Sequence, residues 1–207
     1  GRGGQLNTPA DAPQPTVSIG ITGAPGVGKS TFIGKLARHL RARGRRVGVI
    51  AVDPSSPISG GSVLGDRLRM NEHFNNPDIF IRSLATRGAL GGLSAKTIEI
   101  TDLLKAAGFD YIFIETVGVG QSEVEIASLA DTTLVVFVPE SGDEIQTIKS
   151  GIMEIADIFV VNKADREGAD RLVKNLLSTL HDRPFTGWTV PVAKTTASTK
   201  TGIEELV

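Results

Sequence analysis

Cysteine is absent from the 207 residues, which excludes disulfide bonds, thiolate metal ligands and cysteine nucleophiles. Long apolar runs are also missing: stretches such as Leu134–Val138 fall far short of the roughly 20 residues that a membrane-spanning helix needs. The 23 acidic and 22 basic side chains nearly cancel, so we expect neither nucleic-acid nor membrane binding. Because no basic-then-apolar leader opens the sequence, we expect a cytoplasmic protein, or a mitochondrial-matrix protein if the source is eukaryotic.

Glycine is abundant, with 24 residues or about 12% of the chain, against a usual ~7%. Residues 1–16 contain glycine and proline without apolar periodicity and are predicted to be a flexible lead-in to one domain over residues 17–207. From Val17 onward, short β-branched or apolar runs alternate with helical patterns. The predicted strands are Val17–Thr22, Val47–Val52, Ile79–Arg82, Tyr111–Ile114, Thr133–Val138, Ile158–Val161 and Pro191–Thr195.

Four segments between these strands favour helices, namely Lys29–Arg43, Ser94–Ala107, Ser122–Leu129 and Gly168–His181. Several of the strands are apolar on both faces, as strands covered by helices are. Strands that alternate with helices favour right-handed crossovers. We therefore predict an α/β fold, a mostly parallel sheet with helices on both faces.

A phosphate-binding loop is predicted at residues 23–30, Gly-Ala-Pro-Gly-Val-Gly-Lys-Ser. This string matches G-x-x-x-x-G-K-[ST], and it follows a predicted strand and opens a helix, the context that the motif requires. We expect the backbone N–H groups to form an anion nest, Lys29 to reach the β- and γ-phosphates and Ser30 to bind Mg²⁺. The predicted nucleotide-binding residues here are Gly23, Ala24, Pro25, Gly26, Val27, Gly28, Lys29, Ser30 and Thr31.

A guanine-binding corner is predicted where Asn162-Lys163-Ala164-Asp165 follows the strand Ile158–Val161. The Asp165 carboxylate can accept hydrogen bonds from the N1–H and exocyclic amine of guanine, whereas adenine has no donor pair at that edge and would leave it unpaired. Asn162 is expected to brace the loop, and the stem of Lys163 to cover the base. A second guanine loop is predicted at Thr196, Ala197 and Ser198.

Acidic residues at predicted strand ends indicate a Mg²⁺ site. Glu115 ends the strand before Thr116-Val117-Gly118, and the Gly118 N–H is predicted to sense the γ-phosphate. Asp53 and Asp66 are further candidate ligands beside Ser30, directly or through water, although one or two of these acids could instead cap helices. Arg69 is a candidate for neutralising phosphate charge. Since no glutamine directly follows Gly118, slow intrinsic hydrolysis is expected.

Longer strings make the sequence similar to a known family. They are Ala51–Ser56, Ser59–Met70, Phe80–Arg82, Arg87–Leu93, Glu115–Glu123, Gly142–Lys149 and Gly151–Asp157. With the phosphate and guanine motifs, they resemble the MeaB/ArgK/MMAA family of P-loop GTPases from about Val17 to Leu206. The resemblance implies a SIMIBI-class G domain that binds GTP or GDP with Mg²⁺ and hydrolyses GTP.

The resemblance also implies a partner. Family members look like chaperones of adenosylcobalamin-dependent acyl-CoA mutases, especially methylmalonyl-CoA mutase, in which GTP gates cobalamin loading. A further switch would map to about residues 139–149, where Asp143, Gln146 and Lys149 would report nucleotide state, and Lys149 would aid catalysis together with Lys29, Glu115, Asp66 and Arg69. A homodimer is a further implication. Pro139-Glu140-Ser141 departs from the small-residue run expected before Gly142.

Two other functions stay open from sequence. One is an ATP-dependent kinase linked to amino-acid uptake, which the guanine-binding motif at residues 162–165 disfavours. The other is a nucleotide-dependent adaptor without turnover, which the presence of Lys29, Ser30 and Glu115 disfavours.

Overall fold

The computed structural model describes residues 14–53, 76–85, 90–116, 121–140, 151–182, 184, 187–197, 199 and 201–206. Its strands are β1 (Val17–Thr22), β2 (Val47–Asp53), β3 (Ile79–Ala85), β4 (Tyr111–Thr116), β5 (Thr132–Phe137), β6 (Ile158–Val161) and β7 (Val192–Lys194). They form one sheet in the order β3-β2-β4-β1-β5-β6-β7, and every neighbouring pair is parallel. The predicted parallel α/β fold is confirmed.

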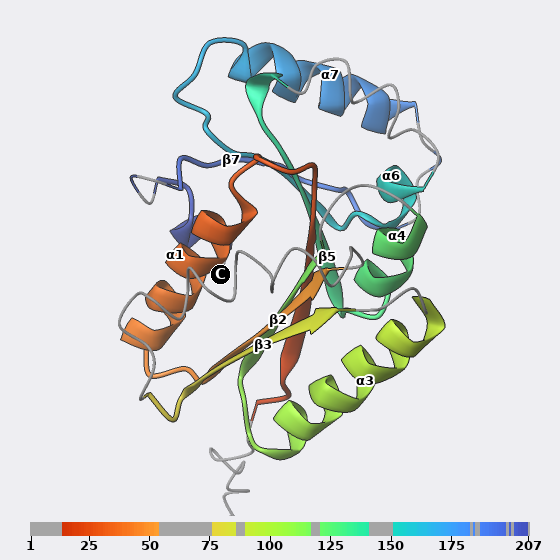
Figure 1. Ribbon diagram of the computed structural model, residues 1–207. Coiled ribbons are helices and arrows are strands. Elements are labelled where there is room, and N and C mark those ends of the chain that lie inside the picture. The colour runs from red at the N-terminus through yellow and green to blue at the C-terminus, as the bar shows by residue number, and fades with distance from the viewer. Residues whose placement is uncertain are drawn as a thin grey trace, which may run out of the picture.

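Helices lie on both faces of this sheet (Figure 1). They are α1 (Lys29–Ala42), α3 (Leu90–Ala106), α4 (Gln121–Ala127), α6 (Ile152–Ile155) and α7 (Ala169–His181), with a short 3₁₀ helix at Glu204–Leu206. Figure 1 shows α1 on one side of the sheet and α3 and α4 on the other. Among the described residues, no helix combines the length and the apolar character that crossing a membrane requires.

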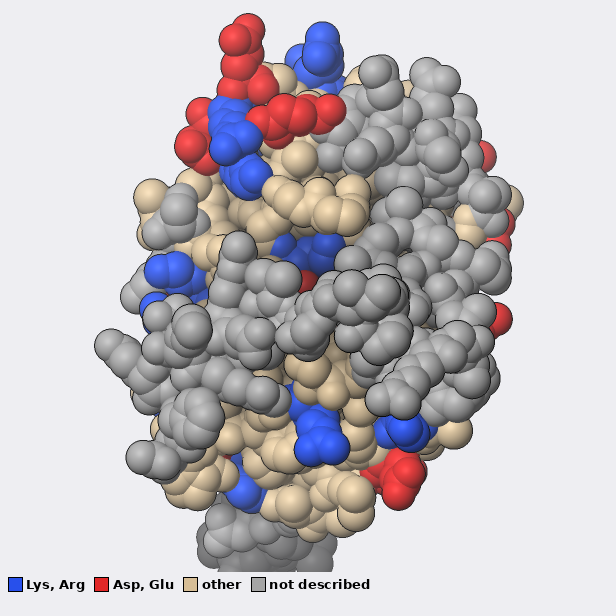
Figure 2. Space-filling model, viewed as in Figure 1, with Lys and Arg blue, Asp and Glu red and all other residues tan. Residues whose placement is uncertain are grey.

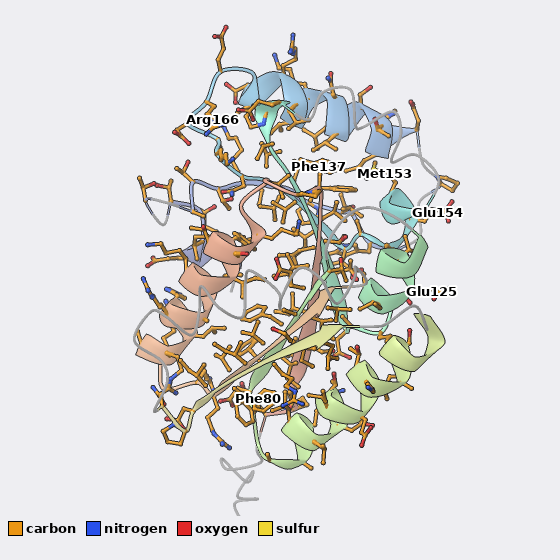
Figure 3. The ribbon with its side chains drawn as sticks, viewed as in Figure 1. Phe80, Glu125, Phe137, Met153, Glu154 and Arg166 are labelled. Atoms are coloured by element: carbon orange, nitrogen blue, oxygen red, sulfur yellow. The ribbon has the colours of Figure 1, made fainter. Side chains whose placement is uncertain are left out.

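The alternation of side chains along the strands divides the core between the two faces. In β5, Leu134 and Val136 pack with α1, whereas Val135 and Phe137 pack with α7 on the opposite face. Figure 3 shows Phe137 and Met153 in the layer below α7. Both sets are buried because a parallel sheet is covered on its two faces, and this leaves the carboxyl edge of the strands for polar groups.

The element boundaries follow the sequence pattern closely, with some differences. β1 and β6 have the predicted bounds, whereas α3 begins at Leu90 instead of Ser94 and α4 begins at Gln121. The helix α6 was not predicted. Of the predicted lead-in, residues 1–13 lie outside the described residues, while Thr16 Oγ1 donates to the Phe109 carbonyl at 2.6 Å.

Candidate nucleotide-binding site

The phosphate loop joins the carboxyl end of β1 to the start of α1, and three of its glycines have positive φ. The values are 151° at Gly23, 85° at Gly26 and 90° at Gly28, in a range of backbone φ that residues with a Cβ rarely adopt. Space is also restricted: a Cβ on Gly23 would lie 2.5 Å from the Val136 carbonyl oxygen, and one on Gly28 would lie 2.6 Å from Asn162 Nδ2. The loop therefore requires glycine at these two positions.

The partial positive charge at the amino end of α1 is not neutralised by side chains of the helix. Gly28 occupies the cap position and provides no side-chain hydrogen bond, and the first turn contains no acidic residue. Backbone N–H groups at such an end carry partial positive charge and favour a bound anion. Together with the left-handed glycines before it, this end can accommodate phosphate.

Lys29 lies inside the loop and is only 6% exposed. Its Nζ donates to the carbonyl of Gly23 at 2.6 Å and to that of Ala24 at 2.8 Å. Burial lowers the pKa of Lys29, and the negative charge of Glu115 acts in the opposite direction. Glu115, which is 5% exposed, ends up beside the loop because it is in register with Ile21 of β1.

The loop after β6 is tied to the phosphate loop by two side chains. Asn162 Nδ2 donates to the Val27 carbonyl at 2.9 Å, and Lys163 Nζ donates to the Gly26 carbonyl at 2.9 Å. Asn162 Oδ1 also accepts from Thr195 Oγ1 and from the Ala197 N–H, each at 3.2 Å. One buried carboxamide thus connects three loops that follow β1, β6 and β7.

A pocket of about 410 Å³ opens beside this junction. Its lining residues are Ala164, Asp165, Lys194, Thr195, Thr196, Thr199 and Thr201. Within this lining, the Thr196 and Thr201 backbones pair in an antiparallel bridge, and the Ala164 N–H donates to the Thr195 carbonyl at 3.0 Å. The pocket combines the Asp165 carboxylate with backbone and threonine side chains, and that carboxylate suits a base with donor groups on one edge.

The structure brings many of the predicted site residues to this edge of the sheet. They are Gly23 to Thr31, Glu115, Asn162, Lys163, Asp165, Thr196 and Ala197. Asp53 ends β2, next to β4, and its side chain lies outside the described residues. Asp66, Arg69, Gly118, Lys149 and Ser198 also lie outside them, so their roles stay predictions.

The described donors suit a magnesium ion by their chemistry. Ser30 in the first turn of α1 offers a hydroxyl and Glu115 a carboxylate. Mg²⁺ prefers oxygen ligands, keeps several waters and takes few ligands from the protein when phosphates are present. Within the described ranges, no three His, Asp or Glu side chains gather as a metal site. Ser30 and Glu115 therefore fit an ion that is held partly by the phosphates of a bound nucleotide.

Several contributors were not predicted from the sequence. The carbonyls of Gly26 and Val27 accept the hydrogen bonds that hold the base loop, and Lys194, Thr195 and Thr201 line the pocket. Backbone acceptors carry no residue signal. Thr195 directly precedes the predicted second guanine loop, and this position is the one signal that could have identified it.

The fold and this site define a P-loop nucleotide-binding protein of the G-domain type. A family model described as "Methylmalonyl Co-A mutase-associated GTPase MeaB" matches residues 10–207. The chain belongs to this MeaB family.

Individual relatives agree with that assignment. A protein of Pyrococcus horikoshii is 54% identical over 192 residues, 91% of this chain and 61% of its own length. The GTPase ArgK of Escherichia coli is 42% identical over 197 residues, 92% of this chain and 59% of its own. The solved structure of a "LAO/AO transport system kinase" superimposes with a TM-score of 0.74 at 34% identity, covering 93% of this chain and 57% of that one. The chain thus spans about three fifths of the length of these relatives.

Proposed function

We propose that this chain binds GTP and GDP with Mg²⁺ and hydrolyses GTP to GDP and phosphate. One observation carries the proposal: Asn162 bonds the Val27 carbonyl of the phosphate loop and the Ala197 N–H beside the base pocket. A nucleotide whose phosphates lie on the loop would therefore place its base next to Asp165. The family assignment supports the same reading.

The chain's own groups would divide the work of phosphate binding. Loop N–H groups and Lys29 would hold the phosphates, and Lys29 would exchange its bonds to the Gly23 and Ala24 carbonyls for phosphate oxygens. Ser30 and Glu115 would hold the ion, with Asp53 and Asp66 as proposed further ligands. When bound, Mg²⁺ supplies charge neutralisation at the β- and γ-phosphates. Gly118, Arg69 and Lys149 are proposed to act on the γ-phosphate and the charge that develops there.

Base selection is proposed to rest on Asp165, with Lys163 over the base. An adenine in the pocket would leave a desolvated carboxylate without donors, and sites of this kind reject the wrong ligand by up to ~10⁴-fold. Titration with GDP and ADP tests this step. We expect GDP to bind at least 100-fold more tightly, and equal affinities would contradict it.

Turnover is tested with Lys29→Ala, and Lys174→Ala on the exposed surface of α7 is the matched control. Because Lys29 alone among the described lysines lies inside the phosphate loop, its loss should abolish GTP hydrolysis, whereas the control should hydrolyse GTP at the parent rate. Hydrolysis that persists at the parent rate in Lys29→Ala would remove this residue from the mechanism.

We further propose that the partner is an adenosylcobalamin-dependent acyl-CoA mutase of the methylmalonyl-CoA mutase type. The description of the family model supports this partner. In this proposal GTP orders the loops next to the phosphate site, and the mutase prefers one loop state; typical coupling changes partner affinity 5- to 150-fold. A homodimer stays a prediction of the family resemblance, and a cytoplasmic or mitochondrial-matrix location stays a prediction from the sequence.

Mutase affinity measured with a non-hydrolysable GTP analogue and with GDP tests the coupling. A difference of at least fivefold, together with a nucleotide effect on cobalamin loading, is expected. Equal affinities and unchanged loading would contradict the chaperone role and leave the GTPase proposal intact.

A second candidate function is phosphotransfer to a protein from ATP, which the name of the similar solved structure favours. It requires ATP to bind as tightly as GTP, so the same nucleotide titration separates the two. A non-hydrolysing adaptor would bind guanine nucleotides, and the unsubstituted protein would show no GTP hydrolysis.

A further inference from the structure

The carboxylate of Asp165 sits at the tip of a tight turn. The Arg166 N–H donates to the Lys163 carbonyl at 3.0 Å, which closes the turn around it. Asp165 is exposed, lines the base pocket and has no hydrogen-bond or ion-pair partner among the described residues. Its location therefore depends on how the backbone is held on either side.

The contacts that hold the turn on its near side all come from residues before Asp165. Asn162 and Lys163 bond the phosphate loop, and the Ala164 N–H bonds the Thr195 carbonyl. None of these contacts restrains the chain after the carboxylate. After the carboxylate, the Ala169 N–H donates to the Arg166 carbonyl at 3.4 Å, a long hydrogen bond that restrains this side of the turn weakly.

The side chain of Arg166 adds a second contact on this side of the turn. Its Nη1 donates to Glu140 Oε1, in the short turn that follows β5. Figure 3 shows Arg166 ahead of α7, and Figure 2, viewed from the same side, shows acidic and basic side chains gathered in that corner. The hydrogen bond from Arg166 is the main cause that lowers the pKa of Glu140, and the charge of Lys163 adds to it.

The backbone next to Glu140 is held in place. Pro139, the residue before it, is buried and lies close to Gly168, where an added Cβ would lie 3.8 Å from Pro139 Cβ. Glu140 thus extends from a buried support toward two cations of the base loop. This is also the position at which the sequence departs from the family pattern, since Glu140 stands where a small residue was expected.

We propose that Arg166 and Glu140 form a positioning pair that holds Asp165 at the guanine edge, which ties base selection to the exit of β5. The inference rests on the proposed function and adds two residues outside the Asn162–Asp165 motif. Both side chains are about half exposed, 51% and 55%, and exposed pairs contribute little to global stability. Loss of the pair should therefore change base discrimination and leave the melting temperature nearly unchanged.

Calorimetry with GDP and with inosine diphosphate tests the pair. Inosine lacks the exocyclic amine, one of the two donors that Asp165 would accept, so its binding depends less on the placement of the carboxylate. Arg166→Ala should weaken GDP binding about twofold to fivefold, in line with an exposed charge pair, and should weaken inosine diphosphate binding less. Glu140→Ala should have the same effect, and the double variant should add little to either.

The control is Arg45→Ala, which removes an arginine that is similarly exposed and lies 3.8 Å from Asp110 at the opposite end of the strands; both affinities should stay unchanged. Raising salt from 0.05 to 0.5 M should shrink the coupling, since exposed charges are screened. Equal losses for the two nucleotides, or none, would overturn the positioning role. A parent protein that binds ADP as tightly as GDP would instead overturn the proposed function, and the pair's role with it.

Discussion

Asn162 Nδ2 lies 2.9 Å from the carbonyl oxygen of Val27, 135 residues earlier in the chain. Asn162 is 2% exposed. Its side-chain amide donates and accepts at the same time, since Oδ1 accepts hydrogen bonds from Thr195 Oγ1 and from the Ala197 N–H. The phosphate and base halves of the site are therefore held at a fixed spacing by one side chain. That spacing would match a nucleotide between its base and its phosphates.

Asn162→Ala should lower both nucleotide affinity and stability. The change leaves the Val27 carbonyl and two donors without a partner, and each buried unsatisfied group costs about 1–3 kcal/mol. We expect GDP affinity to fall at least 100-fold by calorimetry and the melting temperature to drop by several degrees. Asn162→Asp keeps the acceptor and removes the donor, so it should retain the Thr195 and Ala197 bonds and lose only the Val27 bond. A variant that binds GDP as the parent does would show that the spacing is held elsewhere.

Asp165→Asn should change which base binds. An amide can donate to a carbonyl at position 2 of the base, as in xanthine, but no longer accepts both guanine donors. GDP affinity should fall at least 100-fold, while xanthosine diphosphate should bind better than it does to the parent. Competition titrations with both nucleotides measure the switch. If both diphosphates lose affinity alike, Asp165 does not contact the base edge.

Gly28→Ala should eliminate nucleotide binding. Its φ of 90° is unfavourable for alanine, and the new Cβ would lie 2.6 Å from Asn162 Nδ2, which would displace the central carboxamide. Gly44→Ala is the matched control because Gly44 also has a positive φ, 74°, but has no atom within 4 Å of an added Cβ. The control should lose about 1–2 kcal/mol of stability, the cost of a left-handed conformation for a residue with a Cβ, and bind GDP normally. Equal GDP affinity in both variants would exclude the contact with Asn162 as the cause.

Much of the fold could be predicted from the sequence because its strands are apolar on both faces. β1 and β6 were predicted with their observed bounds. The phosphate loop was predicted from its match to G-x-x-x-x-G-K-[ST], and its three glycines have positive φ in the structure. Local patterns were sufficient here since strand burial and loop conformation both depend on neighbouring residues.

The differences arise where the local pattern is weak or misleading. α3 starts at Leu90, four residues before the prediction, although Gly91 and Gly92 disfavour a helix by about 1 kcal/mol each. α6 has four residues, too few for a periodic signal. The contacts of Asn162 with Val27 and of Arg166 with Glu140 join distant segments, so no local pattern predicts them.

Stability should depend on pH through Asp131. Asp131 Oδ2 accepts the Ser18 N–H and Ser18 Oγ, each at 2.9 Å, and these bonds, led by the backbone one, lower the pKa of Asp131. A carboxyl with a lower pKa in the folded than in the unfolded state stabilises the fold above the unfolded value, about 4. This contribution is lost as pH falls from there through the folded value. Asp131→Asn should therefore be less stable than the parent at pH 7, and the difference should shrink below pH 4. Urea unfolding between pH 7 and 3 measures it, and a constant difference across that range would mean that the charge on Asp131 has no part in the β1–β5 contact.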